Sequence, residues 1–190
     1  VSEQIFASIN DGASLLTFFG HSSPGSFDFS IDNPDNYNNA GKYPLMLSLG
    51  CYSGNIFGTE RSISERFCFY EDRGAIAFGA SRGVGFINAL HRFGMEFYRQ
   101  QGGEQYGRGI GDALVATYAA FDGSNSFSIN TLIEQFVLNG DPALRLHPAP
   151  GPDYVVDAAS AAFEPAVPTA QLDSFQLSFD VLNLGRHRED

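Results

Sequence analysis

The sequence is poor in basic residues and in cysteine, and each shortage argues against a class of protein. It carries 11 Lys and Arg against 22 Asp and Glu, a formal net charge of −11, which opposes contact with nucleic acid or anionic membranes. Its two cysteines can form at most one disulfide, too few for a small disulfide-bonded scaffold. No apolar run approaches the roughly 18 residues of a membrane-spanning helix. We therefore expect a globular protein with no nucleic acid partner and no membrane-spanning segment.

The sequence also lacks a recognisable leader, because it begins with Val1 and no basic or strongly apolar segment follows. We interpret it as a piece of a longer protein, so its localisation is not readable from a signal. At 190 residues and 43% hydrophobic content, it is long enough for one full domain and part of a second. Its oligomeric state is not readable either.

Short apolar runs and longer amphipathic runs alternate over most of the chain. The former predict strands and the latter predict helices. The predicted strands are Leu15–Phe19, Leu45–Leu49, Ala75–Gly79 and Ala143–Leu146, and the predicted helices are Val1–Asn10, Thr59–Arg73, Phe86–Gln100, Ile110–Phe121 and Ile129–Val137. This alternation predicts an α/β fold, a three-layer α/β/α sandwich with a mainly parallel sheet.

The composition changes at residues 148–153, where three prolines and a glycine fall within a short segment typical of a linker. Beyond it, apolar and polar residues alternate at Tyr154–Val156 and Phe175–Val181, which predicts β-strands. We therefore predict a first domain over 1–147, a linker, and an incomplete β-sandwich over 154–190.

Two of the predicted strands end at a reactive side chain. Leu15–Phe19 is followed by Gly20 and His21, and Leu45–Leu49 is followed by Gly50 and Cys51. In a parallel sheet both loops emerge at one edge, so we expect His21 beside Cys51. A cysteine attacks a carbonyl as thiolate, and a neighbouring histidine accepts its proton and later protonates the leaving amine.

From these residues alone, catalysis and a structural role are equally good interpretations. A cysteine at a strand end is often structural, and His21 is equally compatible with an ordinary loop histidine. A disulfide between Cys51 and Cys68 is not favoured, because Cys68 lies among aromatic residues of a predicted helix and is more simply a buried thiol.

The segment from Ser22 to Tyr43 is a long loop rich in turn-forming residues, and such loops commonly have a function. One interpretation is that it shapes a substrate cleft. Another is that Asp28, Asp32 and Asp35 bind calcium, but their order does not match a known calcium loop. We therefore prefer a solvated acidic loop and predict no cofactor and no metal, with structural calcium as the alternative.

Four motifs, taken in order along the chain, resemble the gingipain-type cysteine peptidases of family C25. They are Phe18–Ser23, Gly50–Phe57, Gly74–Ala77 and Leu138–Leu144. The resemblance implies a caspase-like fold, N-terminally incomplete in this chain, and an immunoglobulin-like identity for residues 154–190. It also implies a His–Cys dyad at His21 and Cys51, peptide hydrolysis through a thioester, and a secreted or surface location in a bacterium.

The resemblance assigns further roles around this dyad. The backbone N–H groups of Cys51 and Ser22 would form the oxyanion hole, although the family commonly has His-Gly-Ser where this chain has Ser22 after the histidine. The loop from Ala80 to Phe86 would line the specificity pocket through Ser81 and Arg82. Arg82 would then favour an acidic P1 residue in a peptide or protein substrate.

Two alternatives to an endopeptidase stay open: a catalytically inactive C25-like scaffold or adhesion module, and a sortase-like enzyme that transfers the acyl group to an amine. Other ionisable residues receive minor roles. His91 and His187 lack neighbours at metal-ligand spacing, and His147 suits a surface residue before the proline-rich linker. Asp141 suits a turn, and Glu60 and Glu65 lie on a predicted helix directed away from Cys51.

Overall fold

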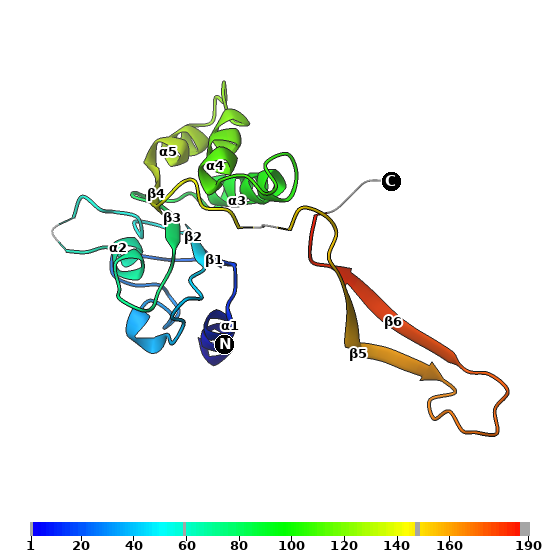
Figure 1. Ribbon diagram of the computed structural model, residues 1–190. Coiled ribbons are helices and arrows are strands. Elements are labelled where there is room, and N and C mark those ends of the chain that lie inside the picture. The colour runs from blue at the N-terminus through cyan, green and yellow to red at the C-terminus, as the bar shows by residue number, and fades with distance from the viewer. Residues whose placement is uncertain (1, 59, 147–148, 187–190) are drawn as a thin grey trace. The chain divides into compact units, whose positions relative to one another are not determined.

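The computed structural model describes residues 2–58, 60–146 and 149–186. Contacts between residues divide the chain into two compact units, Val1–Leu146 and His147–Asp190 (Figure 1). No helix in the described ranges is long and apolar enough to cross a membrane. The two candidate residues, His21 and Cys51, both belong to the first unit.

A four-stranded sheet forms the centre of the first unit, in the order β1-β2-β3-β4. The strands are β1 (Leu15–Phe19), β2 (Leu45–Leu49), β3 (Ala77–Ser81) and β4 (Phe136–Gly140). The first three run parallel, and β4 runs antiparallel beside β3. Every residue of β2 and β3 is buried, as is typical of central parallel strands covered on both faces. The prediction of an α/β fold with a mainly parallel sheet is confirmed.

Helices cover both faces of this sheet (Figure 1). They are α1 (Ser2–Asp11), α2 (Ile63–Cys68), α3 (Ile87–Gly102), α4 (Ile110–Ala119) and α5 (Phe127–Gln135), and a 3-10 turn, η1 (Pro34–Asn36), precedes β2. Leu45, Leu47 and Leu49 of β2 pack in one core with α3, α4 and α5, whereas Met46 packs in a second core with residues of α1 and α2. Because side chains alternate across a strand, β2 contributes to both cores, which gives the three layers.

The last strand of the sheet lies earlier in the chain than predicted. The expected strand at Ala143–Leu146 is wrong, and the expected helix at Ile129–Val137 ends at Gln135. Residues 136–140 instead pair with β3 along its full length, so tertiary pairing overrides the local helical pattern. Asp141 then begins a turn, in which its carboxylate accepts the Ala143 N–H at 2.8 Å, as predicted for this residue.

The boundaries of α2 and β3 also differ from prediction. The helix expected at Thr59–Arg73 is shortened to α2, because Ser62 caps it through a capping box with Glu65; Thr59 lies outside the described residues. The third strand begins at Ala77 rather than Ala75 and continues to Ser81, so it includes the first residues of the predicted pocket loop.

The second unit is an antiparallel hairpin of β5 (Tyr154–Glu164) and β6 (Gln176–Asn183). The pairs Val156 with Val181 and Phe163 with Leu177 lie on either side of a register shift. A single two-stranded hairpin is marginally stable by itself in water. The immunoglobulin-like identity of residues 154–190 stays a prediction.

Candidate active site

The sheet brings His21 and Cys51 to the same edge. Phe19 at the end of β1 pairs with Leu49 at the end of β2, and each candidate residue follows two positions later. Both line one cavity of about 350 Å³, whose other lining residues are Phe19, Gly20, Leu49, Gly85, Phe86, Ile87 and Leu90. The two residues that the sequence analysis singled out are therefore neighbours of a single cavity.

A tight hairpin holds the backbone of His21. The Asp28 N–H donates to the His21 carbonyl oxygen at 3.1 Å, and the His21 N–H donates to the Asp28 carboxylate at 3.3 Å. Ser22 and Phe27 form an isolated antiparallel β-bridge across this hairpin, and the Ser23 N–H donates to the Ser26 carbonyl oxygen at 2.8 Å. The predicted long loop thus begins with an ordered turn, which leaves the His21 imidazole exposed beside the cavity.

Cys51 sits in a sharp turn directly after β2. Tyr52 has φ +59°, a left-handed conformation that is rare for a bulky residue, and its N–H donates to the Gly83 carbonyl oxygen at 2.9 Å. The Gly85 N–H points at Cys51 Sγ, 3.3 Å away. The Gly85 carbonyl oxygen lies 3.8 Å from the same sulfur, so Gly85 contacts Sγ through both of its backbone polar groups.

The predicted oxyanion hole consists of two backbone N–H groups, those of Cys51 and Ser22. Among the described residues, neither the Cys51 N–H nor the Ser22 N–H donates a hydrogen bond to another group of the chain. Cys51 lines the cavity, whereas Ser22 follows His21 in the chain and does not itself line it. The oxyanion hole at these two N–H groups stays a prediction.

The structure does not place the predicted specificity residues in this cavity. Ser81 is fully buried at the end of β3, where its hydroxyl contacts the Gly83 backbone. Arg82 is exposed, and its guanidinium lies over the Phe57 ring at 5.4 Å from the centroid. Neither lines the cavity, which is instead closed by the start of α3.

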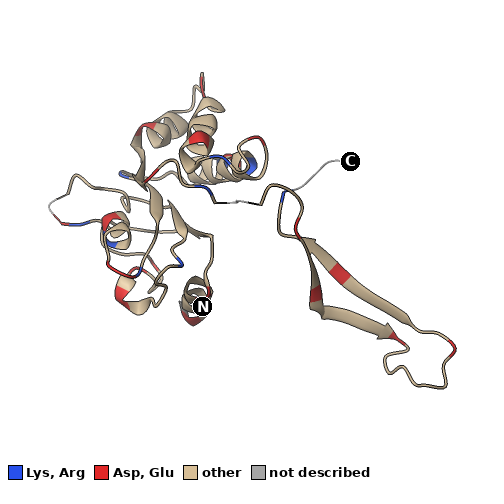
Figure 2. Cartoon of the chain, in the orientation of Figure 1, with Lys and Arg blue, Asp and Glu red and all other residues tan. Residues whose placement is uncertain are grey.

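Sequence reasoning missed the apolar walls of the cavity. Phe19 and Leu49 are the last residues of the two strands, and Phe86 and Ile87 begin α3. The lining contains no Asp, Glu, Lys or Arg among the described residues, although the chain is strongly acidic; Figure 2 shows Asp and Glu spread over helices, strands and loops. One available signal was that Phe86 directly follows the glycine-rich loop after β3.

The second cysteine has a different environment. Both cysteines are free, and Cys68 Sγ lies 3.5 Å from the Asn139 carbonyl oxygen. Burial raises the pKa of the Cys68 thiol to about 12, so it is protonated near neutral pH. Cys68 is therefore a partly buried, protonated thiol, and its structural role stays a prediction.

The three aspartates considered for calcium have separate interactions. Asp28 accepts the His21 N–H, Asp35 accepts the Tyr70 hydroxyl, and Asp32 helps to raise the pKa of Tyr37 beyond the effect of its burial. Within the described ranges, no group of three or more His, Cys, Asp or Glu residues is arranged to hold a metal ion.

The remaining ionisable candidates lie away from Cys51. His91 is exposed on α3, Glu60 is exposed, and Glu65 accepts the Ser62 N–H in the capping box of α2. His147 and His187 lie outside the described residues. None of the described ones lines the cavity of Cys51.

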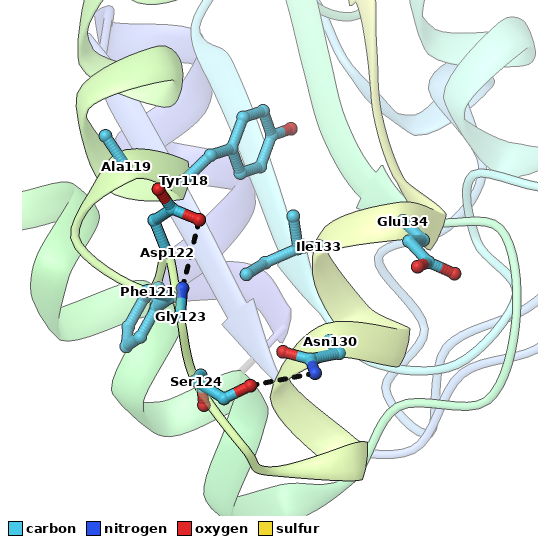
Figure 3. Close-up of a pocket in the computed structure, with 9 residues that line it drawn as sticks. All are labelled: Tyr118, Ala119, Phe121, Asp122, Gly123, Ser124, Asn130, Ile133 and Glu134. Carbon is cyan, nitrogen blue, oxygen red and sulfur yellow. Dashed lines mark hydrogen bonds between the residues drawn. The ribbon is translucent and has the colours of Figure 1, made fainter.

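A separate cavity of about 480 Å³ lies between the end of α4 and α5 (Figure 3). Two of its polar side chains bond within the chain: the Asp122 carboxylate accepts the Gly123 N–H, and Asn130 donates to the Ser124 carbonyl oxygen. It contains neither cysteine nor histidine. The smaller cavity that holds Sγ and an imidazole is therefore the better candidate for chemistry.

The α/β sheet of this chain presents a cysteine and a histidine at one edge. Residues 1–147 match peptidase family C25, and the chain belongs to this family. No match is found among curated protein sequences.

Solved structures share the fold at low identity. The Arg-specific cysteine proteinase gingipain R (RgpB) is 17% identical with a TM-score of 0.67, covering 86% of this chain and 41% of that one. The complex of the Porphyromonas gingivalis RgpB pro- and mature domains is 17% identical with a TM-score of 0.70, covering 86% and 42%. A third structure, of a protease, is 12% identical with a TM-score of 0.66, covering 83% and 42%. This chain thus spans less than half the length of these relatives.

Proposed function

We propose that this chain carries the dyad of a cysteine endopeptidase, with Cys51 as nucleophile and His21 as general acid and base. The observation that supports it is the placement of both side chains at equivalent ends of neighbouring parallel strands, in the lining of one cavity. The family to which the chain belongs is a family of peptidases, which fits the same chemistry.

In the proposed reaction, His21 takes the Cys51 proton, and Sγ attacks the carbonyl carbon of a peptide bond. The carbonyl oxygen becomes an oxyanion, which the N–H groups of Cys51 and Ser22 stabilise. The imidazolium of His21 then gives its proton to the leaving amine as the C–N bond breaks, and a thioester remains on Cys51. His21 then takes a proton from water, whose oxygen attacks the thioester carbonyl carbon. The C–S bond breaks, the carboxylic acid product leaves, and the imidazolium returns its proton to Cys51 Sγ.

The cavity beside Sγ supports an apolar P1 side chain. Its described walls come from Phe19, Leu49, Phe86, Ile87 and Leu90, and no charged side chain stands among them. An apolar wall favours an uncharged hydrocarbon side chain, because burial of a charge without a partner is costly. The competing proposal is that Arg82 selects an acidic P1 residue. It requires the Arg82 guanidinium to move away from the Phe57 ring.

The proposal also covers the substrate, the location of the protein and the identity of residues 154–190. We take the substrate to be a peptide or protein, the location to be secreted or on the surface of a bacterium, and residues 154–190 to be part of an immunoglobulin-like domain. These follow from the resemblance to gingipain-type peptidases. An inactive scaffold and an acyl-transfer enzyme are the outcomes against which the test is designed.

The test is covalent labelling with a peptidyl vinyl sulfone that carries Leu at P1, followed by mass spectrometry of the labelled peptide. We expect an adduct on Cys51 in the unaltered chain, and its loss in Cys51→Ala and in His21→Ala. Labelling that persists in His21→Ala would show that the reactivity of Cys51 does not depend on His21, which contradicts the proposed dyad. No adduct on Cys51 would favour an inactive scaffold. Product analysis of a cleaved peptide with an added amine separates hydrolysis from acyl transfer.

A further inference from the structure

The side chain of Ser22 connects the two loops that carry His21 and Cys51. Its hydroxyl donates a partly buried hydrogen bond of 2.7 Å to the Cys51 carbonyl oxygen. A Cβ placed on Gly50 would collide with this hydroxyl and lie 2.9 Å from the Gly20 carbonyl oxygen. Glycine at position 50 therefore leaves the space that the Ser22 side chain fills.

The peptide unit between Cys51 and Tyr52 is bonded at both ends. Its oxygen accepts the Ser22 hydroxyl, and its N–H donates to the Gly83 carbonyl oxygen at 2.9 Å. Tyr52 has φ +59°, a conformation that a bulky residue keeps only when its surroundings hold it. Without the bond from Ser22, this peptide unit is restrained on one side only, and the direction of the Cys51 side chain is less well defined.

The hairpin that presents Ser22 is itself anchored to α2. The Ile63 N–H donates to the Pro24 carbonyl oxygen at 2.8 Å, and the Arg66 guanidinium donates to the Gly25 carbonyl oxygen at 2.6 Å. The hydroxyl of Ser22 therefore reaches Cys51 from a supported position, which is what an interaction needs in order to fix the geometry of a site.

We propose that Ser22 is a positioning residue whose hydroxyl holds the Cys51 peptide so that Sγ faces the His21 imidazole. This inference rests on the proposed function, because it concerns the same dyad. It is separate from the role of the Ser22 backbone N–H in the oxyanion hole, which Ser22→Ala leaves in place.

The test is the rate at which iodoacetamide alkylates Cys51 in the 190-residue chain between pH 5 and pH 9, a readout that needs no substrate. Arg61 and Arg66 separate Cys51 from Cys68 in a tryptic digest, so mass spectrometry follows each thiol. Ser23→Ala is the matched control. Its hydroxyl accepts the Gly25 and Ser26 N–H groups and bonds to the Ser26 carbonyl and hydroxyl oxygens within the same hairpin, and it makes no hydrogen bond to Cys51 among the described residues.

In Ser22→Ala we expect alkylation of Cys51 below pH 7 to slow by about five- to tenfold, the effect of losing one ordinary hydrogen bond. Ser22→Thr, which keeps a hydroxyl, should stay within about twofold of the unaltered chain, and Ser23→Ala should keep the full pH profile. The proposal is overturned by an unchanged profile in Ser22→Ala, by the same change in Ser23→Ala, or by a folded Ser22→Thr that behaves like Ser22→Ala.

His21→Ala separates failure of this inference from failure of the proposed function. If His21→Ala removes the reactivity of Cys51 below pH 7 and Ser22→Ala does not, only the positioning role fails. If His21→Ala leaves the profile unchanged, there is no dyad to position and both proposals fail.

Discussion

His21 and Cys51 occupy equivalent positions on neighbouring parallel strands, each two residues beyond the pair formed by Phe19 and Leu49. They are 51 − 21 = 30 residues apart in the sequence, yet both line one cavity. The carboxyl ends of parallel strands meet at one sheet edge, so the fold itself provides this proximity. Cys51 directly follows β2, every residue of which is buried.

Gly50→Ala should lower both stability and thiol reactivity. The new Cβ would collide with the Ser22 hydroxyl, and insertion of a methyl group into a packed site costs about 1–3 kcal/mol. Urea unfolding measures the first effect, and alkylation of Cys51 measures the second. Displacement of Ser22 also removes its bond to the Cys51 carbonyl oxygen.

Gly25→Ala is the control for this substitution. Gly25 lies in the adjacent hairpin, and a Cβ placed there meets no atom within 4 Å. We expect its free energy of unfolding to change by no more than about 0.5 kcal/mol. Equal losses in the two glycine variants would contradict the steric explanation.

Cys68 should resist alkylation at pH 7.5 while Cys51 reacts. Burial raises the pKa of the Cys68 thiol to about 12, and only the thiolate is strongly nucleophilic. The measurement is the alkylated fraction of each tryptic peptide over time. Similar rates at the two cysteines would show that Cys68 is not shielded in solution.

The raised pKa of Cys68 also predicts a loss of stability in alkaline solution. The unfolded thiol ionises near pH 9, whereas the folded thiol ionises near pH 12, so the unfolded state releases its proton first. This contribution to stability is complete below pH 9 and is lost as the pH rises towards 12. In urea unfolding, the loss between pH 8 and pH 11 should be smaller in Cys68→Ala than in the unaltered chain.

Two variants distinguish a P1 preference set by the apolar cavity from one set by Arg82. Ile87 is 68% exposed and lines the cavity, so Ile87→Ala should leave the fold intact and weaken the preference for a P1 leucine by several-fold. Arg82→Ala should leave this preference unchanged. If Arg82→Ala instead alters the ratio of acidic to neutral P1 residues in labelling with peptidyl probes, the specificity is set by Arg82.

Ser62→Ala should destabilise the first unit by about 1 kcal/mol, because it removes the N-cap of α2. The matched control is Ser8→Ala in α1, where the exposed serine hydroxyl donates to the Gln4 carbonyl oxygen in the same helix. Alanine favours a helix, so Ser8→Ala should be neutral or slightly stabilising. Thermal unfolding compares the two, and equal losses would show that the cap has no special role.

The sequence by itself determined the α/β class, the first two strands and the two residues at their ends. Leu15–Phe19 and Leu45–Leu49 are apolar runs that stop at glycine, and both became strands with the predicted bounds. Such runs are readable because a central parallel strand must be apolar on both faces. The position of His21 and Cys51 at one edge then follows from parallel pairing alone.

Only the tertiary structure decided where the sheet ends and which residues form the cavity. Phe136–Gly140 continues a helical pattern in the sequence, and it is a strand because β3 offers a free edge to pair with. Ile87 lines the cavity because α3 begins beside the Cys51 turn. Arg82 does not line it, and its guanidinium lies over the Phe57 ring instead. These outcomes depend on contacts between segments far apart in the chain, which no local pattern of residues encodes.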